Sequence, residues 1–227
     1  MNKAIFWDFD GTLVKAPFLW SGSLLKAITT ILPGCNITLE DIRRYTKKGF
    51  TWDSPEEDYS ELIGDKWWEY MLHYFGGIYE KQGVEPELVN KASLLASDYV
   101  KDVSRYQLFD DAIATLEGSR AKGYRNYILS NHLPELGEII AKLGISDYFE
   151  GYIISSLVGY DKPRPELFEY AKKLAGYPEI CYMIGDNPHA DIVGGNAAGM
   201  RTILVHKDVL CDADYTVGEL NQILSII

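Results

Sequence analysis

Residues 4–12 read Ala-Ile-Phe-Trp-Asp-Phe-Asp-Gly-Thr, an apolar run that ends in two aspartates and a glycine. A short apolar run bounded by turn residues predicts a buried β-strand, here over residues 4–7. Gly11 supplies the break that ends this segment. The carboxylates of Asp8 and Asp10 therefore follow the end of a predicted strand, which is where α/β proteins bind their ligands.

The second half of the chain alternates between two kinds of segment. Short apolar runs that suit strands occur at 126–129, 152–154, 181–184 and 202–205, and helical patterns occur at 110–122, 134–143, 164–174, 190–198 and 219–226. Strands that alternate with helices predict a parallel sheet with helices on both faces. The predicted fold class is therefore α/β, with a Rossmann-like parallel sheet whose strands all end at one edge.

The stretch between these two parts has helical periodicity and no convincing strand pattern. Helices are predicted at about 24–32, from Thr38 to about Lys48, at 58–75 and at 86–103. Thr38 and Asp41 have the spacing of a capping box at the start of the second of these helices. We therefore predict an α/β core of residues 1–15 and 106–227, with an inserted helical cap of residues 16–105.

The net charge of the chain limits the kinds of partner that it is expected to bind. Its 227 residues include 22 Lys and Arg against 33 Asp and Glu, which gives a net charge of −11. Nucleic acid binding is not expected, because that function needs basic surface. The three cysteines show no paired spacing and no apolar stretch is long enough to span a membrane, so we expect a cytoplasmic protein. Without a heptad repeat, a monomer is the default expectation.

Polar residues with complementary chemistry follow the predicted strands. Asp8, Asp10 and Asp186 would repel one another unless a cation lay among them, and oxygen ligands of this kind favour Mg²⁺. Ser130 offers a hydroxyl donor and Lys162 a positive charge to a phosphoryl group. A carboxylate can also be the nucleophile in phosphate transfer, forming an aspartyl-phosphate. The combination predicts phosphoryl-transfer chemistry.

These motifs resemble those of the haloacid dehalogenase superfamily. The resemblance rests on FWDFDGTL at 6–13, LSNH at 129–132, DKPRPELF at 161–168 and IGDNPHAD at 184–191, and it continues in GGNAAGMRTILV at 194–205. It covers residues 3–15 and 106–220, with the motifs in the expected order. The inserted helical segment is similar to the α-helical cap of phosphoglycolate-phosphatase-like and β-phosphoglucomutase-like members, in which such caps close over the site and select substrates.

The resemblance implies a role for each motif residue. It implies that Asp8 is the nucleophile, that Asp10 is the general acid and base, and that Asp186 completes a magnesium site with Asp8 and the Asp10 carbonyl. The residues implied to bind the phosphoryl group are Gly11, Thr12, Ser130, Asn131 and Lys162, with Asp191 supporting the lysine or the metal. Members that dehalogenate lack the second aspartate, so Asp10 favours phosphoester chemistry.

The predicted function is thus magnesium-dependent hydrolysis of a small phosphorylated metabolite. A sugar phosphomutase of β-phosphoglucomutase type would use the same core residues, and a non-catalytic binding protein could keep the same fold. Because the nucleophile, the lysine and the metal acids are all present, the binding protein ranks last. Sugar phosphates, phosphoglycolate and nucleotides all stay open as substrates.

Several cap and loop residues have two interpretations. The basic run is a solvated helix face or a contact for an anionic substrate tail, and it consists of Arg43, Arg44, Lys47 and Lys48. The aromatic residues of the third predicted helix pack between helices or form a stacking surface, and they are Trp67, Trp68, Tyr70 and Tyr74. His132 and His189 are interpreted as ordinary loop residues rather than as catalysts.

Overall fold

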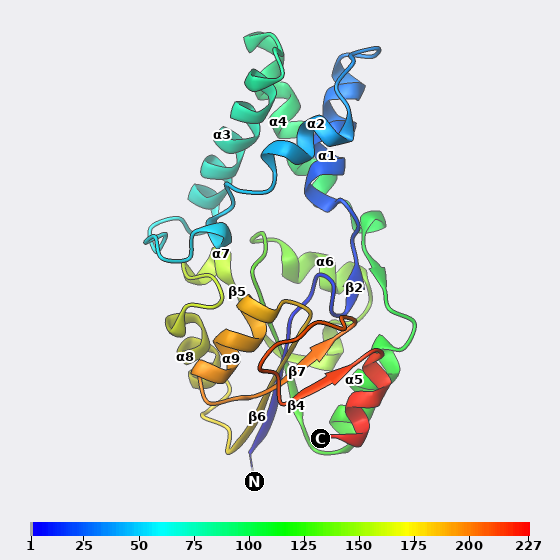
Figure 1. Ribbon diagram of the computed structural model, residues 1–227, viewed down its shortest axis with the longest axis vertical. Coiled ribbons are helices and arrows are strands. Elements are labelled where there is room, and N and C mark those ends of the chain that lie inside the picture. Colours follow the sequence, from blue (N-terminus) through cyan, green and yellow to red (C-terminus); the bar gives the residue numbers. More distant parts are fainter. Residues whose placement is uncertain (1) are drawn as a thin grey trace.

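The computed structural model describes residues 2–227 and shows a parallel sheet below a group of four helices (Figure 1). The sheet has six strands in the order β5-β4-β1-β6-β7-β8, and all of its pairings are parallel. The strands are β1 (Lys3–Trp7), β4 (Arg125–Ser130), β5 (Phe149–Ile154), β6 (Ile180–Gly185), β7 (Arg201–Val205) and β8 (Tyr215–Val217). This arrangement confirms the predicted α/β fold class with its Rossmann-like core.

β1 lies in the middle of the sheet, where both of its faces are covered. Ile5 and Trp7 pack into the core on one face, and Phe6 packs into a second core on the other. A strand buried on both faces needs a nearly continuous apolar run, which β1 has. Trp7 aligns with Ile128 of β4 and with Ile184 of β6. The residues that follow these three strands are therefore brought together at one edge.

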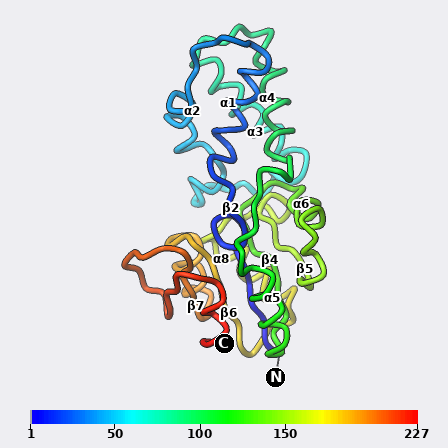
Figure 2. Tube along the Cα trace, turned by 90° about the vertical axis from the view of Figure 1, so that its right-hand side faces the viewer, coloured from blue at the N-terminus to red at the C-terminus, as the bar shows by residue number. Residues whose placement is uncertain are grey.

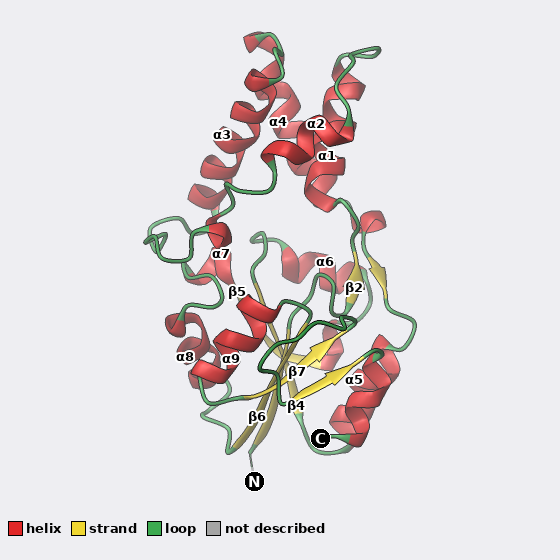
Figure 3. Ribbon diagram, viewed as in Figure 1, coloured by secondary structure: helices red, strands yellow, loops and turns green. Residues whose placement is uncertain are grey.

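Helices cover both faces of the sheet (Figure 3). They are α5 (Ala112–Ala121), α6 (Leu136–Lys142), α7 (Ser155–Val158), α8 (Pro165–Leu174) and α9 (Gly194–Ala197). Leu116 of α5 and Ile139 of α6 belong to the same core as Trp7. Phe168 of α8 belongs to the core that contains Phe6. Helices α5 and α6 thus cover one face of β1, and α8 covers the other.

The cap helices are α1 (Leu19–Ile31), α2 (Leu39–Tyr45), α3 (Asp65–Lys81) and α4 (Pro86–Val100), which lie together at one end of the molecule (Figures 1 and 2). Apolar residues at helical spacing, such as Leu24 of α1 and Phe75 of α3, are fully buried among them. The predicted capping box is present, because Thr38 Oγ1 accepts from the Asp41 N–H at 3.2 Å and Asp41 Oδ2 accepts from the Thr38 N–H at 3.0 Å. None of the helices within residues 2–227 has the length and hydrophobicity that a membrane span requires.

A short antiparallel ribbon lies between the sheet and the cap helices. In it β2 (Val14–Lys15) pairs with β3 (Gln107–Leu108). Strands of two residues are too short to produce a periodic pattern, so the sequence did not predict them. The predicted cap limits, residues 16 and 105, lie next to this ribbon and stay a prediction.

Three predicted helices differ in start or type more than the others, whose ends move by at most about five residues. The helix predicted at 58–75 is α3, which begins only at Asp65 because the Asp58 carboxylate accepts from the Ser60 N–H at 2.9 Å and forms a turn that competes with a helix. The helix predicted at 190–198 starts as a π-helix over Pro188–Val193 before α9. The helix predicted at 219–226 is a 3₁₀ helix over Leu220–Ser225. Strand β8 was missed because its three residues show no clear alternation.

Candidate active site

The carboxyl edge of the sheet faces the cap helices and collects the predicted site residues (Figure 1). Asp8 follows β1 directly, Ser130 ends β4, and Asp186 follows β6. The backbone N–H of Asp8 donates to the carbonyl of Ile184 at 2.9 Å, which continues the pairing of β1 with β6 beyond the end of the strand. The ends of three neighbouring strands thus bring these side chains together.

The Asp8 side chain is 11% exposed and is surrounded by donors. Its Oδ1 accepts from the Ser130 hydroxyl at 2.9 Å and from Lys162 Nζ at 2.8 Å. Its Oδ2 accepts a longer bond of 3.3 Å from the Thr12 hydroxyl. Two short contacts to the carboxylate, one of them from an ammonium, therefore fix its orientation.

Lys162 is buried between two carboxylates. Its Nζ lies 2.6 Å from Asp191 Oδ1 and 2.8 Å from Asp8 Oδ1. Burial alone would lower the pKa of Lys162, but Asp191 and Asp8 raise that pKa above its ordinary value. The side chain is therefore a cation at neutral pH.

Asn131 fixes the backbone of Lys162. Its amide oxygen accepts from the Lys162 N–H at 2.7 Å, and its amide nitrogen donates to the Lys162 carbonyl at 3.0 Å. Both ends of the Asn131 amide are thereby engaged. The side chain thus supports the backbone of the lysine, and its amide nitrogen keeps a second N–H donor, so the expected contact with phosphate stays a prediction.

Asp191 is fully buried and forms an ion pair with Lys162. Its Oδ1 meets the ammonium, and its Oδ2 accepts from the backbone N–H of Asn187 at 2.9 Å. Burial raises the pKa of the Asp191 carboxyl, and the adjacent ammonium opposes that rise. Because both oxygens are engaged within the protein, Asp191 is placed to hold the lysine.

Asp186 is more open than Asp191. Burial and then the charge of Asp8 raise the pKa of Asp186, and Lys207, whose Nζ lies 2.7 Å from Asp186 Oδ2, lowers it. Gly11 approaches closely, since a Cβ on it would lie 2.7 Å from the same oxygen, and its φ is +80°. Only glycine tolerates both conditions. Lys207 had no signal in the sequence, because it stands on a loop outside the motifs.

The carboxylates form a group that fits a divalent cation. Asp8, Asp186 and Asp191 each place an oxygen within 4.8 Å of the others. The charge of Asp8 is one cause of the raised pKa of Asp186, which shows that the two carboxylates repel each other. A cation held by Asp8 and Asp186 would relieve this repulsion. Oxygen donors alone suit Mg²⁺ or Ca²⁺ more than a transition metal.

Asp10 lies beside this group with 34% of its side chain exposed. Its Oδ2 is 3.3 Å from Nε2 of His132, a fully buried side chain whose ring meets Phe9 edge-on at 5.8 Å. Within residues 2–227, neither ring nitrogen of His132 has an aligned hydrogen-bond partner. The interpretation of His132 as an ordinary loop residue did not foresee this contact.

Comparison with known proteins agrees with this arrangement. The family described as haloacid dehalogenase-like hydrolases matches residues 2–199. The chain belongs to this family. The phosphoserine phosphatase of Thermus thermophilus is 34% identical over 151 residues, which are 63% of this chain and 59% of that protein. The match therefore spans less than two thirds of that relative.

Two other proteins are similar to this chain over nearly its whole length. The glyceraldehyde 3-phosphate phosphatase of Pyrococcus furiosus is 32% identical over an alignment of 240 positions, gaps included. This alignment covers 99% of this chain and 92% of the relative. The solved structure of the HAD hydrolase YfnB of Bacillus subtilis, bound to magnesium, matches with a TM-score of 0.77 at 19% identity and covers 99% of this chain and 98% of that one. The structural likeness supports the fold alone.

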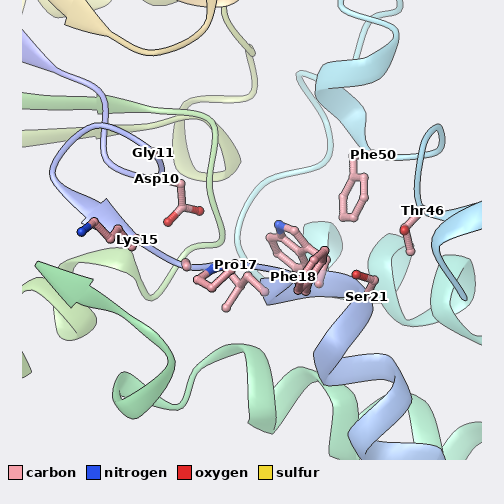
Figure 4. Close-up of a pocket in the computed structure, with 11 residues that line it drawn as sticks. Asp10, Gly11, Lys15, Pro17, Phe18, Ser21, Thr46 and Phe50 are labelled. Carbon is pink, nitrogen blue, oxygen red and sulfur yellow. The ribbon is translucent and has the colours of Figure 1, made fainter. Parts of the chain in front are cut away.

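A cleft of about 680 Å³ opens between the sheet edge of this hydrolase and the cap helices. Asp10 and Gly11 line it from the sheet, and residues 15–21, Thr46 and Phe50 line it from the cap side (Figure 4). The sequence did not identify these cap-side residues, because the segments that carry them meet only through the packing of α1 against the loop after α2.

The basic run of the cap lies away from this cleft. Arg44, Lys47 and Lys48 line a separate groove together with Tyr70 and Tyr74. Within residues 43–48, Thr46 is the residue that lines the cleft itself. Arg43 stacks on the ring of Phe18 with its guanidinium 5.1 Å from the centroid. Arg43 of the basic run thus contacts Phe18, a residue that lines the cleft.

Proposed function

We propose that this chain is a magnesium-dependent phosphatase that hydrolyses a small phosphomonoester through an aspartyl-phosphate on Asp8. The contacts of the Asp8 carboxylate carry the proposal, because it is oriented by the Ser130 hydroxyl at 2.9 Å and by the Lys162 ammonium at 2.8 Å. Both relatives named above are phosphatases of small phosphorylated molecules, which supports phosphomonoester chemistry.

In the first step, an oxygen of Asp8 attacks the phosphorus atom, and the bond from phosphorus to the leaving-group oxygen breaks. Lys162 and Ser130 donate to the phosphoryl oxygens, and the lysine offsets their charge. Asp10, protonated at this stage, gives its proton to the leaving oxygen so that the alcohol departs neutral. The products are the alcohol, a phosphorylated Asp8 and an ionised Asp10.

In the second step, water attacks the phosphorus atom of the phosphorylated Asp8. Asp10 takes a proton from this water, and the bond between phosphorus and the Asp8 oxygen breaks. Inorganic phosphate leaves, and Asp8 is again a carboxylate. Asp10 is again protonated, so one cycle consumes one ester and one water.

Asp8 and Asp186 would hold the metal, and the resemblance of the motifs adds the carbonyl of Asp10. When bound, Mg²⁺ supplies positive charge that neutralises the phosphoryl oxygens. Gly11 leaves room for a ligand beside Asp186, since any larger residue would reach the Asp186 carboxylate. Asp191 keeps Lys162 in place beside Asp8.

Phosphate release from p-nitrophenyl phosphate and from a panel of metabolite phosphates tests the proposal. We expect turnover with Mg²⁺, loss of turnover in EDTA, and recovery when Mg²⁺ is restored. Asp8→Asn should reduce kcat by at least about 10³-fold, as removal of a covalent nucleophile does. Radioactive phosphate bound to the wild-type protein should be released by hydroxylamine, which cleaves acyl phosphates.

Asp41→Asn is a matched control, because Asp41 caps a cap helix away from the site. Its activity should equal that of the wild type. Turnover that survives in Asp8→Asn, or that needs no metal, would contradict the proposal. Dependence on a bisphosphate activator would instead identify a phosphomutase that uses the same residues.

A further inference from the structure

The side of the cleft that faces Asp10 is apolar. Six of the eleven residues that line the cleft are apolar, namely Ala16, Pro17, Phe18, Leu19, Trp20 and Phe50. They come from the segment that leads into α1, from the first residues of α1 and from the loop after α2, opposite Asp10 and Gly11 (Figure 4). In the proposed function Asp10 protonates the leaving oxygen, so the leaving group occupies the space between Asp10 and this wall.

Phe18 has a strained backbone conformation that burial does not explain. Its φ is +56° and its ψ is 30°, in the left-handed region, which is unfavourable for a residue other than glycine. Its side chain is nevertheless 51% exposed, so burial in a core does not offset this cost. An exposed ring held at a cleft by strained backbone suits contact with a ligand.

Other rings support the wall from behind. The centroid of Trp20 lies 5.0 Å from that of Phe50, and the ring of Phe50 stacks on Trp52 with 4.6 Å between centroids. Trp20 also meets the buried Trp67 at 6.3 Å. Rings that pack on one another in these geometries keep their orientation. The wall is therefore preformed and does not depend on a ligand to order it.

The cleft offers few partners to a charged leaving group. Among the residues that line it, Asp10 is the one acid and Lys15 the one cation, and Lys15 Nζ lies 4.7 Å from the centroid of the Phe109 ring. The remaining polar side chains there are the hydroxyls of Ser21 and Thr46. The Arg43 guanidinium, which is not among the lining residues, lies 5.1 Å from the centroid of the Phe18 ring. Lys15 and Arg43 are thus each engaged by a ring, and a leaving group that carries an ammonium and a carboxylate would lose hydration against the apolar wall.

We propose that the wall formed by Phe18, Trp20 and Phe50 selects phosphomonoesters whose alcohol carries an aromatic or other bulky apolar group. This inference rests on the proposed function, because it takes the site of Asp10 as the position of the leaving oxygen. The volume of about 680 Å³ holds a ring together with the phosphoryl group. The wall disfavours esters of amino acids and of small polyols.

A set of primary alkyl phosphates tests the inference without a large change in leaving-group chemistry. The set is phenethyl phosphate, ethyl phosphate, glycerol 3-phosphate and O-phosphoserine. We expect phenethyl phosphate to be hydrolysed with a kcat/KM that exceeds those of the other three esters by about tenfold or more, the discrimination that an apolar pocket gives. In Phe18→Gly the ratio between phenethyl and ethyl phosphate should fall about tenfold, mainly because phenethyl phosphate binds more weakly and its KM rises.

Phe18→Gly also removes the left-handed strain, so its fold should be at least as stable as that of the wild type. Tyr177→Ala is the matched control, because Tyr177 has a φ of +49°, is 58% exposed and lies outside the cleft. That variant should keep the wild-type ratio. Equal use of glycerol 3-phosphate or O-phosphoserine by the wild type, or an unchanged ratio in Phe18→Gly, would overturn the inference while the phosphatase proposal stood. Absence of turnover on every ester would instead defeat the proposed function.

Discussion

Lys162 and Asp191 form a buried ion pair in which Nζ lies 2.6 Å from Asp191 Oδ1. The same nitrogen reaches Asp8 Oδ1 at 2.8 Å, so one ammonium joins a carboxylate of the candidate nucleophile to a carboxylate that is fully buried. Asp191 cannot meet a substrate in the cleft because it has no exposed surface. Its contribution to activity is therefore indirect, and Lys162 is the candidate catalytic side chain that it contacts.

Asp191→Asn tests this dependence. The substitution keeps the shape of the side chain but leaves the buried ammonium with Asp8 as its single carboxylate partner. We expect the free energy of unfolding to fall by about 3 kcal/mol, the cost of breaking a buried pair. We expect kcat to fall by about 10²-fold, because the lysine is less firmly held beside the phosphoryl group. Urea unfolding and phosphate release measure the two effects.

Glu138→Gln provides the control for this comparison. Glu138 pairs with Lys142 at 3.9 Å on an exposed helix face, where the two side chains are 70% and 57% exposed. Exposed pairs of this kind contribute little, so the free energy of unfolding should change by less than about 0.5 kcal/mol. Equal losses of stability in the two variants would show that the Lys162–Asp191 pair has no special role.

Gly11→Ala should damage the metal site. The new Cβ would lie 2.7 Å from Asp186 Oδ2, and the backbone there has a φ of +80°. We expect a loss of about 1–3 kcal/mol in the free energy of unfolding from the strained backbone. We also expect the Mg²⁺ concentration for half-maximal activity to rise, because the Asp186 carboxylate must move.

Gly123→Ala separates strain from contact. Gly123 has a φ of +83°, and a Cβ on it would meet no atom within 4 Å. Its stability should fall as in Gly11→Ala, while its Mg²⁺ dependence should match the wild type. If both variants shifted the Mg²⁺ dependence alike, crowding at Asp186 would not be the cause.

Much of the core could be predicted because its signals are local. The apolar run of β1 is a direct consequence of burial on both faces, and the glycine at position 11 reflects a backbone that other residues do not tolerate there. Parallel strands end at one edge, so residues that follow Trp7, Leu129 and Gly185 had to converge. The grouping of Asp8, Ser130 and Asp186 followed from this geometry.

The cleft wall and the supports of the motif residues could not be predicted in the same way. Phe18 and Phe50 are far apart in sequence and meet across the cleft only through tertiary packing. Lys207 reaches Asp186 from a loop with no motif of its own. The two bonds of the Asn131 amide to the backbone of Lys162 depend on how two loops pack, which the motif alone does not indicate.

His132→Asn should impair the protonation of poor leaving groups. His132 Nε2 lies 3.3 Å from Asp10 Oδ2, close enough for the buried ring to restrict the movement of the carboxyl group even without an aligned hydrogen bond. We expect kcat for ethyl phosphate to fall about tenfold, because an alkoxide needs a proton to leave. For p-nitrophenyl phosphate the loss should be smaller, since p-nitrophenolate leaves without one. Equal losses on both substrates would indicate a structural role alone.

Asp161→Asn should make the protein more stable at neutral pH. Asp161 is 5% exposed, and burial raises its pKa above the ordinary 3.8. The folded state therefore binds more protons than the unfolded state between these two pKa values, and the stability of the wild type falls as pH rises through that window. Above both pKa values, each pKa unit of difference between the two states lowers the free energy of unfolding by about 1.4 kcal/mol. The neutral amide of the variant avoids this loss.

Urea unfolding of the wild type and of Asp161→Asn between about pH 3 and pH 8 measures this effect. The two free energies of unfolding should agree at the acid end and diverge as pH rises, with the variant more stable. Asp102→Asn should behave oppositely, because a hydrogen bond from the Ser104 N–H lowers the pKa of Asp102, so its carboxylate stabilises the fold at neutral pH and loses that effect in acid. A difference between the wild type and Asp161→Asn that did not vary with pH would contradict the prediction. The carboxyl of Asp161 would then bind protons equally well in the folded and unfolded states, with the effect of burial offset by the charge of Lys162.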